Sequence, residues 1–280
     1  MNTPELKQLA TQLRLDILHM VHKANSGHVT TSLSAIDIIT MLYFGEVDGE
    51  RILKVDAAKP HWDGRDYFIL SKGHGCPALY AVLAHLGFFP KEELNHLRQI
   101  NALLEGHPVR KIPGIEATTG PLGQGISFAN GIGMALKMDK KTNRVYVVLG
   151  DGELQEGQIW ESAMTAVQYK LDNVICFVDN NKLQQTNFVR AVKPVEPIGP
   201  KFSAFGWHVI NVLNGHDFDE IRDAIRRAWK VKMKPVMIVC NTVKGKGVAF
   251  TEQKPNYHGV PLSKEEMAVA VPELEKLLTK

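Results

Sequence analysis

The chain has 280 residues, of which 44% are hydrophobic and 22% are charged, so it can bury one large core and is not a fibrous or disordered protein. Its 33 basic and 30 acidic residues give a net charge of +3 without forming a basic stripe, which excludes nucleic acid as a partner. No apolar run is long enough to cross a bilayer and the amino terminus lacks a secretory pattern, so we expect a cytoplasmic protein with no membrane partner.

The first half of the chain predicts helices that alternate with glycine-rich loops. Thr3 and Pro4 open a helix whose apolar stripe ends near Asn25. The elements expected next are a helix over 34–44, a strand over 67–70, a helix over 77–86, an irregular segment over 103–116 and a helix over 126–138. Glycine-rich turns before helices bind anions through backbone N–H groups and the helix dipole, so the loops before 77 and 126 are candidate anion sites.

The second half predicts a strand, a helix and a strand in succession. The apolar run 145–149 and the run before Asn180 are typical of buried parallel strands, and 154–170 between them has helical spacing. Further strands are expected over 207–213 and 236–243, and the proline-rich stretch 193–200 is expected to be a loop. These patterns predict an α/β fold with a parallel sheet flanked by helices, as a single domain over residues 1–280.

Polar residues follow the two central strands directly. Gly150, Asp151 and Gly152 follow the first strand, and Asn180 and Asn181 follow the second. The carboxyl ends of parallel strands share one edge of a sheet, where open α/β sheets bind ligands. A carboxylate and an amide oxygen suit magnesium, and glycines leave room for phosphate against the backbone. The pattern therefore predicts a site for a divalent metal and a diphosphate.

This spacing resembles the signature of thiamine diphosphate enzymes, and GDGELQEGQIWE over 150–161 is similar to transketolase. Five further transketolase-like motifs occur in family order: NSGH at 25–28, LSKGHG at 70–75, GHP at 106–108, TTGPLGQG at 118–125 and HGVPL at 258–262. The resemblance covers nearly the whole chain, but only the diphosphate-binding part of a full-length transketolase. The pyrimidine-binding and carboxyl-terminal domains of that family have no counterpart in it.

The resemblance implies a set of cofactor ligands in a thiamine diphosphate-binding fold. The metal, Mg²⁺ or in its place Ca²⁺ or Mn²⁺, would be bound by the side chains of Asp151 and Asn181 and the carbonyl of Leu183. The residues implied around thiamine diphosphate are His74, Gly120, Leu122, Gly152, Asn181, Lys244 and His258.

The resemblance also implies the residues that handle protons. His28, His107 and His258 would line the channel above the thiazolium and contact the hydroxyls of the donor sugar, and imidazoles of near-neutral pKa suit that work. Glu156 would communicate with the neighbouring active site across a subunit interface. His208 and His216 lie outside the motifs and are expected to be structural, as is Glu161.

The function implied is that of the amino-terminal subunit of a split transketolase. It would transfer a two-carbon ketol unit from a ketose phosphate to an aldose phosphate in the pentose phosphate pathway. In the family, the glutamate that activates the cofactor belongs to the pyrimidine domain. We therefore expect the chain to be inactive until a separate pyrimidine-domain subunit completes a heterotetramer.

Several alternatives remain at this point. TTGPLGQG and HGVPL favour transketolase over deoxyxylulose-phosphate synthase or a keto-acid dehydrogenase subunit. A transketolase for a sulfonated or branched sugar stays open. A non-catalytic cofactor-binding protein is disfavoured because the proton-handling histidines accompany the metal ligands. Of the three cysteines, Cys176 and Cys240 are expected to be buried and reduced, whereas Cys76 could be exposed.

Overall fold

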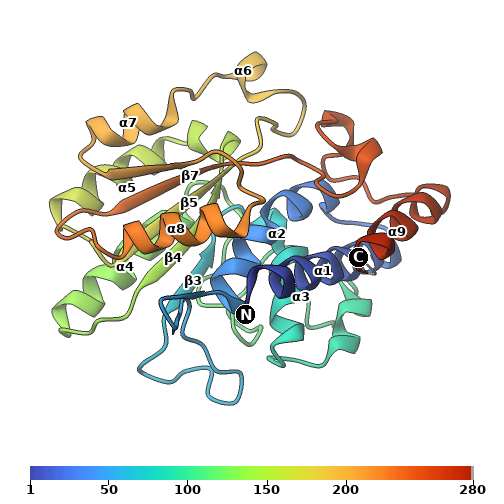
Figure 1. The fold of residues 1–280 in the computed structure, drawn as a ribbon, viewed down its shortest axis with the longest axis horizontal. Helices are drawn as coiled ribbons and strands as arrows, with labels where there is room; N and C mark the ends of the chain where they lie inside the picture. The colour runs from blue at the N-terminus through green and yellow to red at the C-terminus, as the bar shows by residue number, and fades with distance from the viewer. Residues whose placement is uncertain (279–280) are drawn as a thin grey trace.

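A parallel sheet forms the centre of the molecule in the computed structural model, which describes residues 1–278 (Figure 1). The last two residues of the predicted domain 1–280 lie outside the described part. Within it, the five parallel strands have the order β3-β4-β5-β7-β6. They are β3 (Tyr67–Leu70), β4 (Val145–Gly150), β5 (Val174–Asn180), β6 (His208–Val212) and β7 (Val236–Asn241). The predicted α/β fold with a helix-flanked parallel sheet is confirmed.

Helices cover both faces of this sheet. One face packs against α2 (Val29–Phe44) and α8 (Phe218–Ala228). Helices α1 (Thr3–Ala24) and α3 (Cys76–His85) pack on α2, and α9 (Lys264–Leu278) packs on α1. The other face packs against α4 (Gly125–Met138), α5 (Gly157–Gln168) and α7 (Ile198–Ala204). In Figure 1 the group of α1, α3 and α9 lies on the right and the group of α4, α5 and α7 on the left. A short helix, α6 (Val189–Val192), and an antiparallel pair, β1 (Glu46–Val47) and β2 (Glu50–Arg51), complete the α-helices and strands of residues 1–278.

Strand β4 shows why the central strands are apolar along their whole length. Tyr146 and Val148 belong to the core beside α2 and α8, whereas Val145 and Val147 belong to the core beside α4 and α5. Successive side chains of a strand point to opposite faces, and here both faces are covered. The strand therefore has no solvent-facing side on which polar residues would be favoured.

The register of the strands brings their carboxyl ends together. Gly150 of β4 pairs with Asp179 of β5, and Asp179 pairs with Cys240 of β7. The loops that follow these strands, and the loop that follows β3, therefore meet at one edge of the sheet. This is the edge at which the sequence predicts a ligand site.

Three predicted boundaries were wrong for identifiable reasons. The helix predicted over 34–44 begins earlier, at Val29, because tertiary packing overrides the weak helix propensity of β-branched residues. The helix predicted over 154–170 divides into a 3₁₀ turn, Gly152–Gln155, and α5, since Glu156 between them has an extended backbone. The loop predicted over 193–200 ends in helix α7, in which Pro200 occupies the first turn, where no backbone N–H is needed.

Helix α8 was missed although its start has a sequence signal. Asp217 caps it by accepting hydrogen bonds from the backbone N–H groups of Asp219 and Glu220.

The prediction that Cys76 could be exposed was wrong, because Cys76 is buried at the start of α3, with its Sγ 3.2 Å from the carbonyl oxygen of Gly106. Cys176 and Cys240 are free and buried, as predicted. No helix within residues 1–278 has the length and apolarity needed to cross a membrane.

A buried ionic network joins α1, α2 and the loop after β6. Arg14 donates to both carboxylate oxygens of Asp37, at 3.0 and 2.5 Å, and Nδ1 of His216 lies 2.6 Å from the same carboxylate. Nε2 of His216 accepts from the backbone N–H of Val243 at 2.8 Å, so His216 makes structural contacts, as expected. Burial by itself raises the pKa of Asp37, but Arg14 and His216 outweigh burial and lower that pKa to about 2.

We predict that Asp37→Ala lowers the free energy of unfolding by about 3–5 kcal/mol at neutral pH, because it leaves the buried Arg14 guanidinium unpaired. The folded-state pKa lies below the ordinary value of 3.8, so the contribution of Asp37 is complete above about pH 4 and is lost as the pH falls toward 2. Urea unfolding at several pH values measures this difference, with the exposed Asp139→Ala as the control. Equal unfolding free energies for Asp37→Ala and the wild type at pH 7 would contradict it.

Candidate functional site

A cavity of about 400 Å³ lies at the carboxyl edge of the sheet. All the site residues predicted from the sequence line it: His28, His74, His107, Gly120, Leu122, Asp151, Gly152, Glu156, Asn181, Leu183, Lys244 and His258. The structure thus brings together residues that are up to 230 positions apart in the chain (258 − 28). Their individual roles remain predictions.

Each of the main side chains reaches this cavity from the end of a regular element. His28 directly precedes α2, and His74 lies in the 3₁₀ turn Gly73–Gly75 that follows β3. Asp151 and Asn181 are the first residues after β4 and β5, and Lys244 lies in the loop after β7. The order of the strands, rather than any local sequence, therefore places them around one space.

Three histidines stand together at the cavity. The ring centroids are 5.1 Å apart for His28 and His74, 5.2 Å for His28 and His258, and 5.4 Å for His74 and His258. Burial, followed by neighbouring cations, lowers the pKa of His28 to about 4 and that of His258 to about 3, and burial also holds the pKa of His74 well below its usual value. These imidazoles are therefore neutral at pH 7 and can accept or donate hydrogen bonds.

Asp151 has the surroundings of a cation ligand. Its carboxylate accepts from the backbone N–H groups of Gly152 at 2.8 Å and Lys182 at 2.5 Å. Burial, reinforced by the charge of Asp179, raises the pKa of Asp151 to about 7, which means that the ionised form lacks enough positive charge nearby. A bound cation would supply that charge.

Asn181 and Leu183 extend this set of oxygen donors. Oδ1 of Asn181 accepts one hydrogen bond, from Leu183 N–H at 3.1 Å, which leaves the oxygen a second lone pair. One carboxylate, one amide oxygen and one backbone carbonyl suit magnesium, which completes its coordination with water and phosphate oxygens. Across the part of the chain that the structure describes, no three His, Cys, Asp or Glu residues group as a metal site, so a metal here would depend on amide and carbonyl oxygens.

Two buried lysines border the same cavity. Lys72 forms an ion pair with Asp179, and its Nζ also lies 3.4 Å from the carbonyl oxygen of Thr31. Nζ of Lys244 lies 2.5 Å from Nδ1 of His258, and no carboxylate within residues 1–278 forms an ion pair with Lys244. Burial first, and the charge of Lys72 next, lower the pKa of Lys244 to about 7. A buried lysine without an acidic partner fits an anionic ligand.

Glu153, which the sequence reasoning missed, joins three loops of the site. Its buried carboxylate accepts from Ser71 Oγ at 2.5 Å, Gly123 N–H at 2.9 Å and Gly150 N–H at 3.0 Å. Gly123 has a φ of +86°, a conformation that glycine adopts without strain. Lys72 and Glu153 lie inside the quoted motifs and Asp179 directly precedes the two asparagines, and this placement of charged residues was the sequence signal that could have drawn attention to them. Their burial is known only from the structure.

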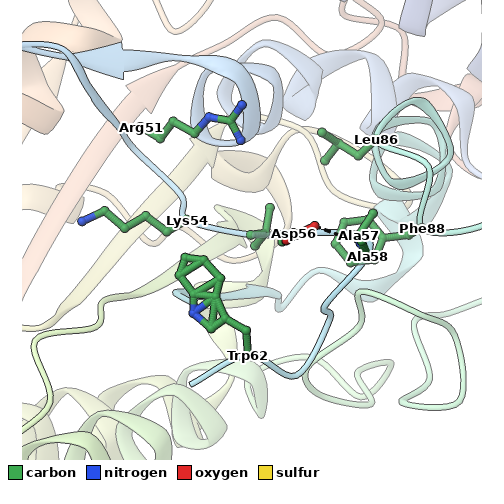
Figure 2. A pocket seen from close by; sticks show the side chains of 9 residues that line it. Arg51, Lys54, Asp56, Ala57, Ala58, Trp62, Leu86 and Phe88 are labelled. Carbon is green, nitrogen blue, oxygen red and sulfur yellow. Dashed lines mark hydrogen bonds between the residues drawn. The ribbon is translucent and has the colours of Figure 1, made fainter. Parts of the chain in front are cut away.

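A second cavity, of about 600 Å³, lies away from these residues (Figure 2). Figure 2 shows Trp62 and Phe88 among its lining side chains, together with the bases Arg51 and Lys54. Lys54 already faces Glu50 at 3.8 Å, and none of the lining side chains is a buried polar group without a partner. This cavity therefore lacks the converging polar groups that characterise the first.

Comparisons with known proteins agree with the geometry. The model of the family described as "Transketolase, thiamine diphosphate binding domain" matches residues 6–274. The chain is similar to the 6-deoxy-6-sulfo-D-fructose transketolase subunit SqwG of Clostridium sp. (strain MSTE9), with 44% identity over 97% of this chain and 97% of that protein. It is also similar to an apulose-4-phosphate transketolase subunit of Phocaeicola vulgatus, with 37% identity over 100% of this chain and 97% of that protein.

Solved structures give the same answer for the fold. The crystal structure of transketolase from Campylobacter jejuni superposes with a TM-score of 0.90 and 34% identity, and it covers 98% of this chain. The match spans only 43% of that transketolase chain. The chain thus corresponds to less than half of a full-length relative and to nearly the whole of the two subunit proteins.

Proposed function

Because the chain belongs to the transketolase family, we propose that it is the diphosphate-binding subunit of a two-chain transketolase. The complete enzyme would transfer a two-carbon ketol unit from a ketose phosphate to an aldose phosphate. The observation that carries the proposal is that proton-handling histidines and the groups expected to bind a metal diphosphate line the same cavity. Neutral histidines stand about 5 Å apart beside the buried Asp151 and Lys244, so proton transfer and diphosphate binding can occur together.

The cavity fits thiamine diphosphate, which the matched family model names, and we propose that a divalent metal is bound with it. When bound, this cofactor supplies the electron sink for cleavage of a carbon–carbon bond. We assign the metal, Mg²⁺ with Ca²⁺ or Mn²⁺ as substitutes, to Asp151, Asn181 and the Leu183 carbonyl. The residues assigned to the organic cofactor and its phosphates are His74, Gly120, Leu122, Gly152, Asn181, Lys244 and His258.

The near-neutral pKa expected of the histidines is not what burial produces: the pKa values of His28, His74 and His258 lie well below that range, so these rings are neutral at pH 7. A ketol transfer removes a proton from a sugar hydroxyl and returns one to another oxygen. When Lys244 is protonated it donates to Nδ1 of His258, so the neutral ring of His258 carries its proton on Nε2 and can donate it to a sugar oxygen. Nδ1 of His28 is buried and has no hydrogen-bond partner within residues 1–278. We assign His28, His107 and His258 to donor binding and proton transfer.

The proposed partner is a chain with the pyrimidine-binding domain, which supplies the activating glutamate in this family. Glu156, assigned to communication across the subunit interface, is exposed and lines the cavity. Glu156 stands at the start of α5, and α4 and α5 expose the apolar side chains of Phe128 and Met164, which a partner would cover. We propose a heterotetramer in which each site lies between two chains.

The two subunit relatives favour a second candidate for the substrate. Their names specify sulfofructose and apulose phosphate, which are a sulfonated and a branched sugar. The pentose phosphate sugars and these unusual ketoses present the same two-carbon unit to the histidines. They differ at the distal end, which in this family is bound by the pyrimidine-domain chain. The partner would therefore decide between the two candidates.

We predict that the purified chain with Mg²⁺ and thiamine diphosphate shows no ketol transfer, and that adding the pyrimidine-domain chain restores it. Parallel assays with fructose 6-phosphate, 6-deoxy-6-sulfofructose and apulose 4-phosphate as donors would identify the substrate class. Because the cofactor would contact both chains, its binding should strengthen the association of the two chains. By linkage, association should strengthen cofactor binding by the same factor. Sedimentation with and without Mg²⁺ and thiamine diphosphate measures the change in association. Full activity of this chain alone, in a preparation free of host transketolase, would refute the two-chain proposal.

Asp151→Ala should weaken binding of Mg²⁺ and thiamine diphosphate to the assembled complex by at least about 100-fold. A loss of that size is the largest usually caused by residues that only orient a metal ligand, and a ligand itself should matter more. The reason is that the diphosphate would lose the metal that compensates its charge. Calorimetry with Asp139→Ala as the exposed control checks the change. An affinity equal to that of the control would remove Asp151 from the metal site.

Replacement of His28 or His258 by alanine should leave the cofactor bound and lower turnover by roughly 10²–10⁴-fold, the range for loss of a general acid or base. His208, exposed at the start of β6, provides the matched control. Steady-state kinetics and cofactor titration on the same samples separate turnover from cofactor loss. Turnover equal to that of His208→Ala would return both histidines to a structural role.

A further inference from the structure

Arg98 joins two loops that carry proposed catalytic histidines, although it does not itself line the cavity. Its Nη1 donates to Ser26 Oγ at 2.8 Å, and its Nη2 donates to the carbonyl oxygen of Gly106 at 3.2 Å. Ser26 lies two residues before His28, and Gly106 directly precedes His107. One planar guanidinium thus spans the two segments.

The contact between Arg98 and Gly106 depends on the absence of a side chain. A Cβ at Gly106 would lie 2.9 Å from Nε of Arg98, closer than real Cβ atoms approach other heavy atoms. Arg98 itself has a φ of 59°, in the left-handed region that non-glycine residues rarely adopt. Its backbone N–H donates to the carbonyl of Leu104 at 2.8 Å, which closes the loop around this conformation.

Tyr80 of α3 supports the second loop from the other side. Its hydroxyl lies 3.0 Å from the carbonyl oxygen of Glu105 and 2.9 Å from that of His107. This support fixes the loop of His107 to the helical core. The loop of His28 is linked to it through Arg98 and Ser26.

We propose that Arg98 is a positioning residue for ketol transfer, which sets His28 and His107 relative to one another by bridging their loops. This inference rests on the proposed function and deepens it. The guanidinium is needed because its two arms point to different acceptors at once. A lysine ammonium is a single point charge on a flexible stem and cannot reproduce this geometry.

The charge of Arg98 gives the proposal a second readout. Burial lowers the pKa of both His28 and His107, and the Arg98 charge is the next cause for each. Removing that charge should therefore raise both pKa values. The other titratable or charged groups that face His28 are His107, whose pKa would change with that of His28, and Lys244, Lys72, His74 and His258, which the substitution leaves in place.

Two variants separate geometry from charge in the assembled complex. Arg98→Lys keeps the charge but loses the bridge, so we expect kcat to fall by about 10–100-fold with the acid limb of the pH profile unmoved. Arg98→Met loses both, so kcat should fall and the acid limb should move to higher pH. Cofactor affinity should stay within about twofold of wild type in both, because Arg98 does not line the cavity. Arg110→Lys and Arg110→Met, in the same segment but exposed, are the matched controls.

The proposal is overturned if Arg98→Lys and Arg98→Met turn over like the Arg110 controls. It is also overturned if cofactor affinity falls in step with kcat, because that would indicate a general structural role. If the wild-type complex shows no ketol transfer, the proposed function fails, and NMR on the full chain then tests Arg98 alone. Arg98→Met should raise the titration midpoints of His28 and His107, and both variants should speed amide exchange at 26–28 and 105–107. Unchanged midpoints and exchange rates would overturn the inference.

Discussion

The buried carboxylate of Asp179 is the group on which the site depends. It accepts hydrogen bonds from Lys72, Ser34, Asn181 and Thr242, which belong to the loop after β3, helix α2, the loop after β5 and the loop after β7. Burial raises its pKa, but the ion pair with Lys72 outweighs burial and holds the pKa below the ordinary value, so it stays ionised. A buried charge is tolerated only when its partners are in place, so the four segments are held together.

Glu153 applies the same constraint to further loops of the site. Together the two carboxylates bind the loops after β3, β4, β5 and β7 and the turn before α4. Lys72 compensates the charge of Asp179, whereas Glu153 accepts three hydrogen bonds while burial raises its pKa. Asp151 and Lys244 remain as an acid and a base without an ion pair, and burial shifts their pKa values toward 7. An acid and a base that both lack a buried counter-ion suit a ligand with charges of both signs, which describes a metal diphosphate.

The same burial shapes the proposed chemistry. His258 and His28, with pKa values of about 3 and 4, are almost never protonated at neutral pH. They would therefore act as neutral hydrogen-bond donors and acceptors, and their loops would determine their positions. Catalysis would then depend on position, which makes the bridge through Arg98 and the contact of His258 with Lys244 important. Glu156 is exposed at the start of α5, and α4 and α5 expose the apolar side chains of Phe128 and Met164, which the proposed second chain could cover.

Much of this site could be predicted from residue order alone. The apolar runs 145–149 and 236–243 gave strands nearly at their observed bounds, and polar residues after parallel strands share an edge in any such sheet. The start of α2 at Val29 and the helical turn at Ile198–Pro200 could not be read locally, since packing overrode weak propensities there. Glu153, Asp179 and Arg98 each depend on at least one partner that is tens of residues or more away in the chain, and the shifted pKa values arise from burial. Spacing along a chain specifies neither contact nor burial. The contacts of these three residues and the shifted pKa values therefore arise only in the folded protein, in which the register of the strands brings their loops together.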